Sequence, residues 1–237
     1  MNKSNKTTLT YTDFIILSVI FFGYFSYVAI TGYLYATPEQ TITATTFDDT
    51  ANYLSIATEL ILLAIAGAYL AWRRFDFSLL AFCWDRYTLP LTLLLIIIGA
   101  MTTDAVLYGW HYLLTGYHPF ADISTAHLSI SGIFGQLTLS LVLFSLLNGF
   151  FEELLFMGLA FAVKPEHRTL AIATSLFVRF IFHVYQGIPS AIAITMTGLM
   201  FILVRRKVQN LVPFMLAHAV FDVFGAGILS FFLPSEV

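Results

Sequence analysis

Long apolar stretches, separated by short polar segments, follow one another along the whole chain. A helix needs roughly 20 mostly apolar residues to cross the ~30 Å hydrocarbon core of a bilayer. Stretches of about this length or longer lie at residues 14–34, 53–72, 89–110, 128–163, 169–186, 188–204 and 211–233. The pattern therefore predicts an all-α fold, a polytopic transmembrane helix bundle of about seven spans.

The lengths of two of these stretches decide how they are interpreted. Residues 14–34 are too long for the apolar core of a removable signal peptide, and no small-residue cleavage site follows them, so we expect them to be retained as a span. Residues 128–163 exceed one perpendicular span. We expect their less apolar first part to lie along or above the outer interface.

The basic residues predict the orientation of the spans. Short cytoplasmic loops carry an excess of Lys and Arg. Under a single seven-span threading, ten of the eleven basic residues fall on one side of the membrane: Lys3, Lys6, Arg73, Arg74, Arg86, Lys164, Arg168, Arg205, Arg206 and Lys207. The connections 35–52 and 111–127 contain none. We therefore expect the N-terminus in the cytoplasm and the C-terminus outside, with the eleventh basic residue, Arg179, inside a span.

Composition supports a membrane protein and excludes several other classes. Of the 237 residues, 59% are hydrophobic and 11% are charged, whereas soluble domains carry about 25% charged residues. The formal net charge of -3 argues against a nucleic-acid partner. A single cysteine, Cys83, excludes a disulfide framework and a cysteine-built metal site. The expected surroundings are membrane lipid, in a multi-pass protein of the cell membrane.

Ionisable side chains inside spans are costly and are therefore functional candidates. Glu59 and Asp104 are single acids on otherwise apolar spans, and we interpret each as paired with a neighbouring helix for structural reasons. The other intramembrane polar groups concentrate after residue 150. This distribution predicts an N-terminal scaffold of three spans (1–127) and a catalytic core of four spans (128–237).

The second half of the chain places a set of polar side chains at one depth. Their members are Glu152 and Glu153 on one span, Arg179 and His183 four residues apart on the next, and His218 and Asp222 four residues apart on the last. Counted from the basic anchors at ~1.5 Å per helical residue, Glu152, His183 and His218 lie roughly 18, 22 and 16 Å deep. We therefore predict that three helices deliver these side chains to one cavity.

Three kinds of chemistry fit this set. One carboxylate and two imidazoles are a ligand set for a divalent metal such as Zn²⁺, with water in the fourth position. Without a metal, Glu152 and one histidine could activate water while the second histidine stabilises an oxyanion. The same groups could form a proton relay in a transporter, but transporters usually show an internal repeat and paired broken helices, and the sequence shows neither.

Three motifs in order resemble the CPBP family, the intramembrane proteases related to the CAAX prenyl endopeptidase and to bacteriocin-immunity or Abi proteins. They read FEELLFMG (151–158), SLFVRFIFHVYQG (175–187) and LVPFMLAHAVFD (211–222). The resemblance implies an all-α bundle with a cavity open toward the cytoplasm. It also implies that Glu152 with His183 activates water, that His218 with Asp222 stabilises the oxyanion, and that Glu153 supports the site. The family has been described both as metalloproteases and as glutamate-dependent proteases.

One position departs from the family pattern, because Met157 stands where the first motif usually has Arg. Two adjacent buried carboxylates need a cation, and Arg179 is the only other cation inside the membrane. We therefore predict that Arg179 pairs with Glu152 or Glu153.

We therefore interpret the sequence as a bacterial-type intramembrane endopeptidase of the plasma membrane. Its expected substrates are membrane-associated or CAAX-like peptides or proteins, hydrolysed near the cytoplasmic half of the bilayer. The alternative is a catalytically silent bacteriocin-immunity or scaffold protein.

Overall fold

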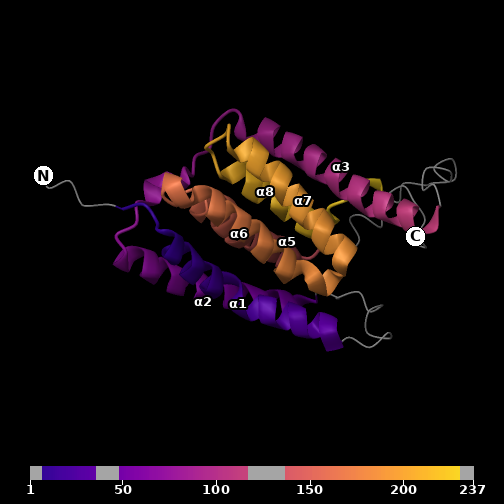
Figure 1. Cartoon of the computed structure of the whole chain (residues 1–237), viewed down its shortest axis with the longest axis horizontal. Coiled ribbons are helices and arrows are strands. Elements are labelled where there is room, and N and C mark those ends of the chain that lie inside the picture. The colour runs from indigo at the N-terminus through magenta and orange to yellow at the C-terminus, as the bar shows by residue number, and fades with distance from the viewer. Residues whose placement is uncertain (1–6, 36–47, 117–136, 230–237) are drawn as a thin grey trace, which may run out of the picture.

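The protein folds as a bundle of helices, as the computed structural model shows (Figure 1). The structure describes residues 7–35, 48–116 and 137–229. The long elements are α1 (Tyr11–Tyr35), α2 (Asp49–Trp72), α3 (Thr88–Thr115), α5 (Leu139–Glu153) with its continuation η3 (Leu154–Leu159), α6 (Pro165–His183), α7 (Ile188–Arg205) and α8 (Val212–Phe224). Two short 3₁₀ turns, η1 (Phe77–Leu80) and η4 (Val184–Gln186), complete the described helices. The prediction of an all-α bundle is confirmed.

Six of these helical segments are long and apolar enough to cross a membrane, and α8 is a shorter apolar helix. About seven spans, as predicted, agree with this set, and the chain is a multi-pass membrane protein. The part of the stretch 128–163 that was expected at the outer interface lies mostly outside the described residues. Its described part begins α5 at Leu139, where the side chain of Thr138 accepts a hydrogen bond from Leu141 N–H.

The last predicted span, 211–233, is wrong at its C-terminal end. Helix α8 ends at Phe224, because the chain leaves the helix at Gly225 with a φ of 84°. Beyond the turn, the carboxylate of Asp104 on α3 accepts hydrogen bonds from the backbone N–H groups of Ile228 (3.0 Å) and Leu229 (3.1 Å). Asp104 therefore has a structural role, as expected, although its partners are backbone groups of a returning segment rather than a side chain on another helix.

The helices are arranged with α1 and α2 on one side, α3 on the other, and the remaining helices between them (Figure 1). The main contacts join α5 to α8 and α2, α6 to α1 and α7, and α3 to α7 and α8. Helices α5 and α8 approach so closely that a Cβ at Gly149 would lie 2.5 Å from the carbonyl oxygen of Met215. Small residues permit this kind of backbone approach in membrane bundles.

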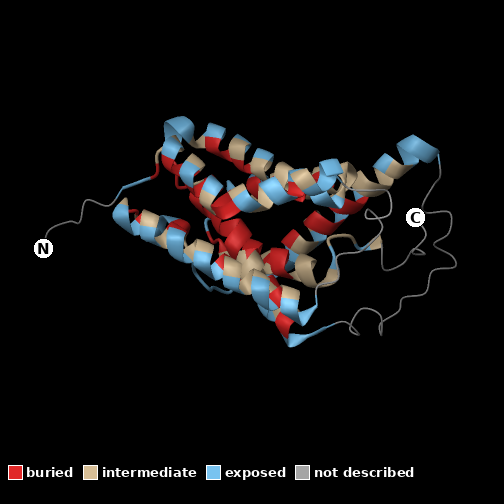
Figure 2. Cartoon of the chain, turned by 90° about the horizontal axis from the view of Figure 1, so that it is seen from below, coloured by how far each residue is buried: buried red, intermediate tan, exposed pale blue. Residues whose placement is uncertain are grey.

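The interior is aromatic and the outer faces are apolar. The rings of Phe21 and Phe151 are tilted toward each other with their centroids 4.7 Å apart, and those of Phe22 and Phe156 stack with theirs 4.8 Å apart. The outward faces of the long helices are largely exposed (Figure 2) and carry large apolar side chains such as Leu93. Exposed apolar side chains along whole helix faces suit contact with lipid rather than water.

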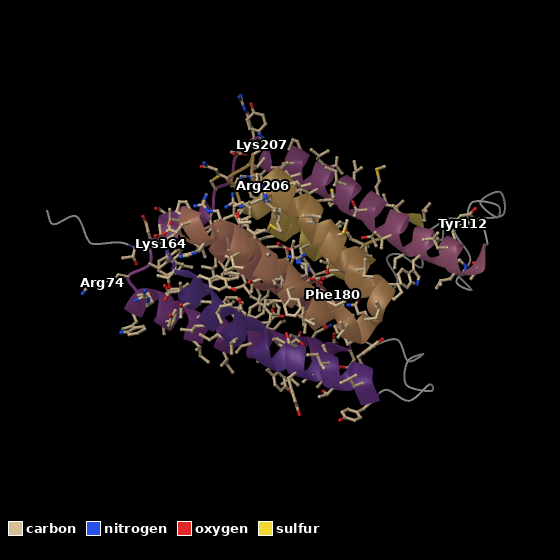
Figure 3. The ribbon with its side chains drawn as sticks, viewed as in Figure 1. Arg74, Tyr112, Lys164, Phe180, Arg206 and Lys207 are labelled. Carbon is tan, nitrogen blue, oxygen red and sulfur yellow. The ribbon has the colours of Figure 1, made fainter. Side chains whose placement is uncertain are left out.

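One end of the bundle collects basic residues. Arg74, Lys164, Arg206 and Lys207 lie at that end, and Tyr112 lies at the other (Figure 3). We call it the basic end. Backbone hydrogen bonds join the connections there, from Thr7 N–H to Arg74 (3.1 Å) and from Leu9 N–H to Ala162 (3.1 Å).

A partly exposed ion pair also lies near the basic end. The carboxylate of Asp13 on α1 accepts hydrogen bonds from Arg73 Nε (2.7 Å) and from the Tyr69 hydroxyl (2.7 Å), which ties α1 to α2. The grouping of basic residues follows the predicted threading. Lys3 and Lys6 lie outside the described residues, and the assignment of this end to the cytoplasm stays a prediction.

Candidate active site

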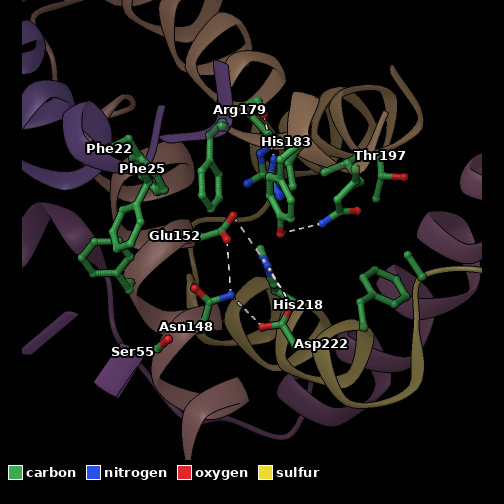
Figure 4. A pocket seen from close by; sticks show the side chains of 18 of the residues that line it. Phe22, Phe25, Ser55, Asn148, Glu152, Arg179, His183, Thr197, His218 and Asp222 are labelled. Carbon is green, nitrogen blue, oxygen red and sulfur yellow. Dashed lines mark hydrogen bonds and ion pairs between the residues drawn. The ribbon is translucent and has the colours of Figure 1, made fainter. Parts of the chain in front are cut away.

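A cavity of about 690 Å³ lies inside the bundle (Figure 4). Most of its wall is apolar, with aromatic side chains from α1, α5 and α6. Its polar lining consists of Ser55, Glu59, Thr103, Asn148, Glu152, Arg179, His183, Gln186, Thr197, His218 and Asp222, together with the hydroxyl-bearing Tyr185. Glu152, His183 and His218 therefore line one cavity, as predicted.

The cavity extends in the direction opposite to the one that the resemblance implied. Its wall includes Gly32, which lies 21 residues beyond the start of α1, or about 32 Å along the helix from the basic end. Nearer the basic end the bundle is filled by fully buried side chains such as Phe14, Leu17 and Phe214. The expectation of a cavity toward the basic, predicted cytoplasmic, end is therefore wrong. The cavity runs from the middle of the bundle toward the other end.

Glu152 presents one free carboxylate oxygen in this cavity. The residue is 2% exposed, near the end of α5. Its Oε1 accepts a hydrogen bond from Asn148 Nδ2 (3.3 Å), whereas the buried Oε2 has no hydrogen-bond partner. The nearest basic group to Oε2 is His218 Nε2, at 3.7 Å. One carboxylate oxygen is thus held in place and the other is available to a ligand or a water.

Asn148 is a site residue that sequence reasoning missed. Its amide also donates to Asp222 Oδ2 (2.8 Å), so it bridges the carboxylates of α5 and α8. The signal was in the sequence, because Asn148 lies four residues before Glu152 and therefore on the same helix face. Its amide carries no charge, so a search for ionisable groups inside spans does not single it out.

His183 is oriented by the backbone of its own helix. Its Nδ1 lies 2.7 Å from the carbonyl oxygen of Arg179. A carbonyl oxygen only accepts, so Nδ1 carries the proton and, in the neutral ring, Nε2 keeps its lone pair. The ring of Phe182 packs edge-on against the imidazole, with centroids 4.5 Å apart. Helix α6 ends at His183, which leaves the imidazole at the cavity wall.

Glu153 lies behind the cavity wall and joins three helices. It is fully buried, and its Oε1 accepts hydrogen bonds from Arg179 Nη2 (2.6 Å) on α6 and from His218 Nδ1 (2.7 Å) on α8. The predicted pairing of Arg179 with one of the two glutamates is confirmed, and the partner is Glu153. Arg179 also lies over the ring of Phe156, 4.3 Å from its centroid.

A glycine on α7 makes room for this arginine. A Cβ built at Gly198 would lie 2.9 Å from Arg179 Cδ and 3.1 Å from Nε. Both distances are shorter than ordinary van der Waals contact, so any side chain at 198 must displace the arginine. The position of the guanidinium therefore depends on a residue that no charge pattern would have singled out.

The first motif continues into a π-helix, η3, directly after Glu153. Single π-helical turns of this kind occur frequently at functional sites. Met157 lies in this turn, fully buried in the apolar core, and its carbonyl accepts a hydrogen bond from Arg205 Nε (3.2 Å). Glu153 thus has two basic partners without any contribution from position 157.

His218 lies among three carboxylates. Besides the contact with Glu153, its Nε2 is 3.5 Å from Asp222 Oδ1 and 3.7 Å from Glu152 Oε2. Ionised carboxylate oxygens only accept, so a ring that faces carboxylates with both of its nitrogens acts as a donor at both. His218 then presents an N–H group to the same space as the free oxygen of Glu152.

The metal hypothesis finds no ligand geometry in the described part of the chain. No group of three or more His, Cys, Asp or Glu side chains there is arranged to hold a metal ion. Glu152, His183 and His218, the set considered for Zn²⁺, line one cavity but do not converge as ligands. We therefore assign no chemical step to a metal.

Glu59 does not have the structural partner that was expected from the sequence. It was interpreted as paired with a neighbouring helix, yet it lines the cavity, and within residues 7–35, 48–116 and 137–229 it forms no ion pair with a basic side chain. Its Oε2 is buried and without a hydrogen-bond partner.

A comparison with protein families agrees with the three motifs. Residues 134–224 match the family model Rce1-like, described as type II CAAX prenyl endopeptidase Rce1-like. This segment contains all the motif residues above, from Glu152 to Asp222. The predicted resemblance to the CPBP intramembrane proteases is thereby confirmed for this segment, which is similar to the Rce1-like family. No curated protein and no solved structure matches the chain.

Proposed function

We propose that this protein is an intramembrane endopeptidase that cleaves a membrane-associated or CAAX-like peptide with a water molecule activated by Glu152 and His183. The observation that carries the proposal is the unpartnered Oε2 of Glu152 in the cavity that His183 and His218 also line. A buried carboxylate oxygen without a partner is costly. A water bound to it would satisfy it, and His183 Nε2 would accept the second hydrogen of that water.

The first step is attack on the scissile carbonyl. Glu152 takes a proton from the water as its oxygen forms a bond to the carbonyl carbon, and His183 keeps the water oriented. The protonated His218 donates its Nε2 hydrogen to the oxygen that becomes negative. A fixed donor at such a place, away from bulk water, is usually a large contribution to the rate.

The second step returns the proton. The amine leaves as the carbon–nitrogen bond breaks, and Glu152 gives it the proton taken from water, so that the products are a carboxylic acid and an amine. Asn148 keeps Glu152 and Asp222 in place during both steps, through its bonds to the two carboxylates. Arg179 acts as a positioning residue, because it fixes Glu153, which in turn holds the ring of His218.

The test is cleavage of a library of membrane peptides by the purified protein in proteoliposomes, with products identified by mass spectrometry. Glu152→Gln keeps the shape of the side chain but cannot take a proton, and we expect it to lower the rate by 10²-fold or more. Leu93→Ala, on a lipid-facing position of α3, is the matched control and should cleave like the unmodified protein.

Cleavage that persists in Glu152→Gln would overturn the proposed chemistry. Absence of any cleavage by the folded, unmodified protein would instead support a catalytically silent membrane protein. The observation that favours this second function is Met157, which stands where the family motif usually has Arg.

A further inference from the structure

Glu59 projects an unsatisfied carboxylate into the cavity from a helix outside the matched domain. It lies on α2, whereas the Rce1-like segment begins at residue 134. The residue is 3% exposed, and its Oε2 has no hydrogen-bond partner. Ser55, one turn earlier on the same helix face, lines the cavity with it. The proposed chemistry uses neither residue.

The basic groups near the cavity are already engaged. Three carboxylates line it: Glu59, Glu152 and Asp222. Arg179 and His218 also line it, but both donate to the single oxygen Oε1 of Glu153, behind the wall. His218 additionally lies between Glu152 and Asp222. Within the described residues no basic side chain forms an ion pair with Glu59, so its carboxylate is available to a cation that enters the cavity.

A buried carboxylate at position 59 is energetically unfavourable unless it has a function. Ionised groups inside a bilayer are rare unless they are paired or serve a ligand. Glutamine or leucine would fill the same volume without the cost of removing a charge from water. The rest of the wall is apolar and aromatic, including Phe22, Phe25 and Phe182. Such a wall suits an alkyl stem, and aromatic faces attract a cation.

We infer that Glu59 is a specificity-determining residue that binds a positively charged group of the substrate, the ammonium or guanidinium of a Lys or Arg side chain near the scissile bond. The inference rests on the proposed function, because it names the substrate class of the same cavity. Glu152 and Asp222 add to the negative potential around the bound cation. The substrate is then an apolar membrane peptide with one basic side chain that enters the cavity.

The experiment measures binding, so that it does not depend on turnover. The probes are two acetylated, fluorescently labelled membrane peptides that differ only in one lysine, replaced in the second by the uncharged, similarly shaped norleucine. They are titrated against the Glu152→Gln protein in lipid nanodiscs, with the lysine moved through successive positions of the peptide. We expect one position at which the lysine peptide binds roughly 10- to 100-fold more tightly, as hydrogen bonds to charged groups allow.

Variants of α2 then assign the preference. In the Glu59→Gln, Glu152→Gln double variant the lysine and norleucine peptides should bind alike. Leu60→Ala, at a neighbouring exposed position of α2, is the matched control and should keep the full preference. Glu59→Asp keeps the charge and should retain part of it, which guards against a loss caused by misfolding of the glutamine variant.

Two results would overturn the inference. One is equal binding of the two peptides to the Glu152→Gln protein at every lysine position, as expected if Glu59 is simply protonated. The other is a lysine preference that survives Glu59→Gln. A third peptide, with norleucine and a free amino terminus, shows whether a terminal ammonium serves as well as a side chain. If the lysine peptide binds through Glu59 but the unmodified protein cleaves nothing, the inference holds and the protease function fails.

Discussion

Replacing Arg179 with methionine should destabilise the whole bundle, because it leaves Glu153 buried with one partner fewer. The arginine side chain is 3% exposed and the glutamate side chain is fully buried, with 2.6 Å between Nη2 and Oε1. Removing one member of such a pair typically costs about 3 to 5 kcal/mol. His218 still donates to the same oxygen, so we expect a loss near the lower end of this range in the free energy of unfolding.

The assay is reversible unfolding in mixed micelles with increasing SDS, followed by circular dichroism. Arg206→Met is the matched control, since Arg206 is exposed at the basic end, and its effect should stay within about 0.5 kcal/mol. The double variant Arg179→Met, Glu153→Gln removes both charges and should lose less than Arg179→Met alone. An Arg179→Met protein within 1 kcal/mol of the unmodified one would refute the reasoning, because the pair would then contribute little to the fold.

Three further changes test other parts of the structure. Gly198→Ala should displace Arg179 and lower both stability and cleavage. Gly67→Ala, where a Cβ meets nothing within 4 Å, should be neutral or stabilising. Equal effects of the two variants in thermal unfolding would contradict the close packing of Gly198 against Arg179. Asp13→Asn should destabilise the protein less than Arg179→Met, because the Arg73 side chain is 37% exposed and can turn to water; a larger loss in the same unfolding assay would show that the helix-joining role of Asp13 is underestimated. Met157→Arg should destabilise the otherwise unmodified protein, because it buries a charge. In the Arg179→Met protein the same change should restore part of the lost stability. No recovery there would show that a side chain at position 157 does not reach Glu153.

The sequence predicted the fold well because membrane spans leave a strong signal. Long apolar stretches and the alternation of basic connections arise from the thickness and polarity of the bilayer, not from details of packing. The helix ends were less predictable. Helix α8 ends at Gly225 although the apolar stretch continues, because backbone conformation and the hydrogen bonds to Asp104 decide the end of the helix.

The candidate site was predictable where chemistry and spacing combine. Glu152, His183 and His218 could be brought together from helix depth alone. Two features were not accessible in this way. The direction of the cavity depends on which half of the bundle large side chains fill, and the place of Glu59 depends on how α2 packs against α5. Both are properties of packing between segments far apart in the sequence.

The claim at the centre of this interpretation is that water, activated by Glu152, attacks the peptide bond directly. The measurement is cleavage of a peptide from the library in H₂¹⁸O with hydroxylamine present, with the new carboxyl terminus analysed by mass spectrometry. Direct attack predicts a single ¹⁸O atom in that terminus, no hydroxamate, and loss of both products in Glu152→Gln. A hydroxamate, which would reveal a covalent acyl intermediate, or undiminished cleavage by Glu152→Gln, would contradict it.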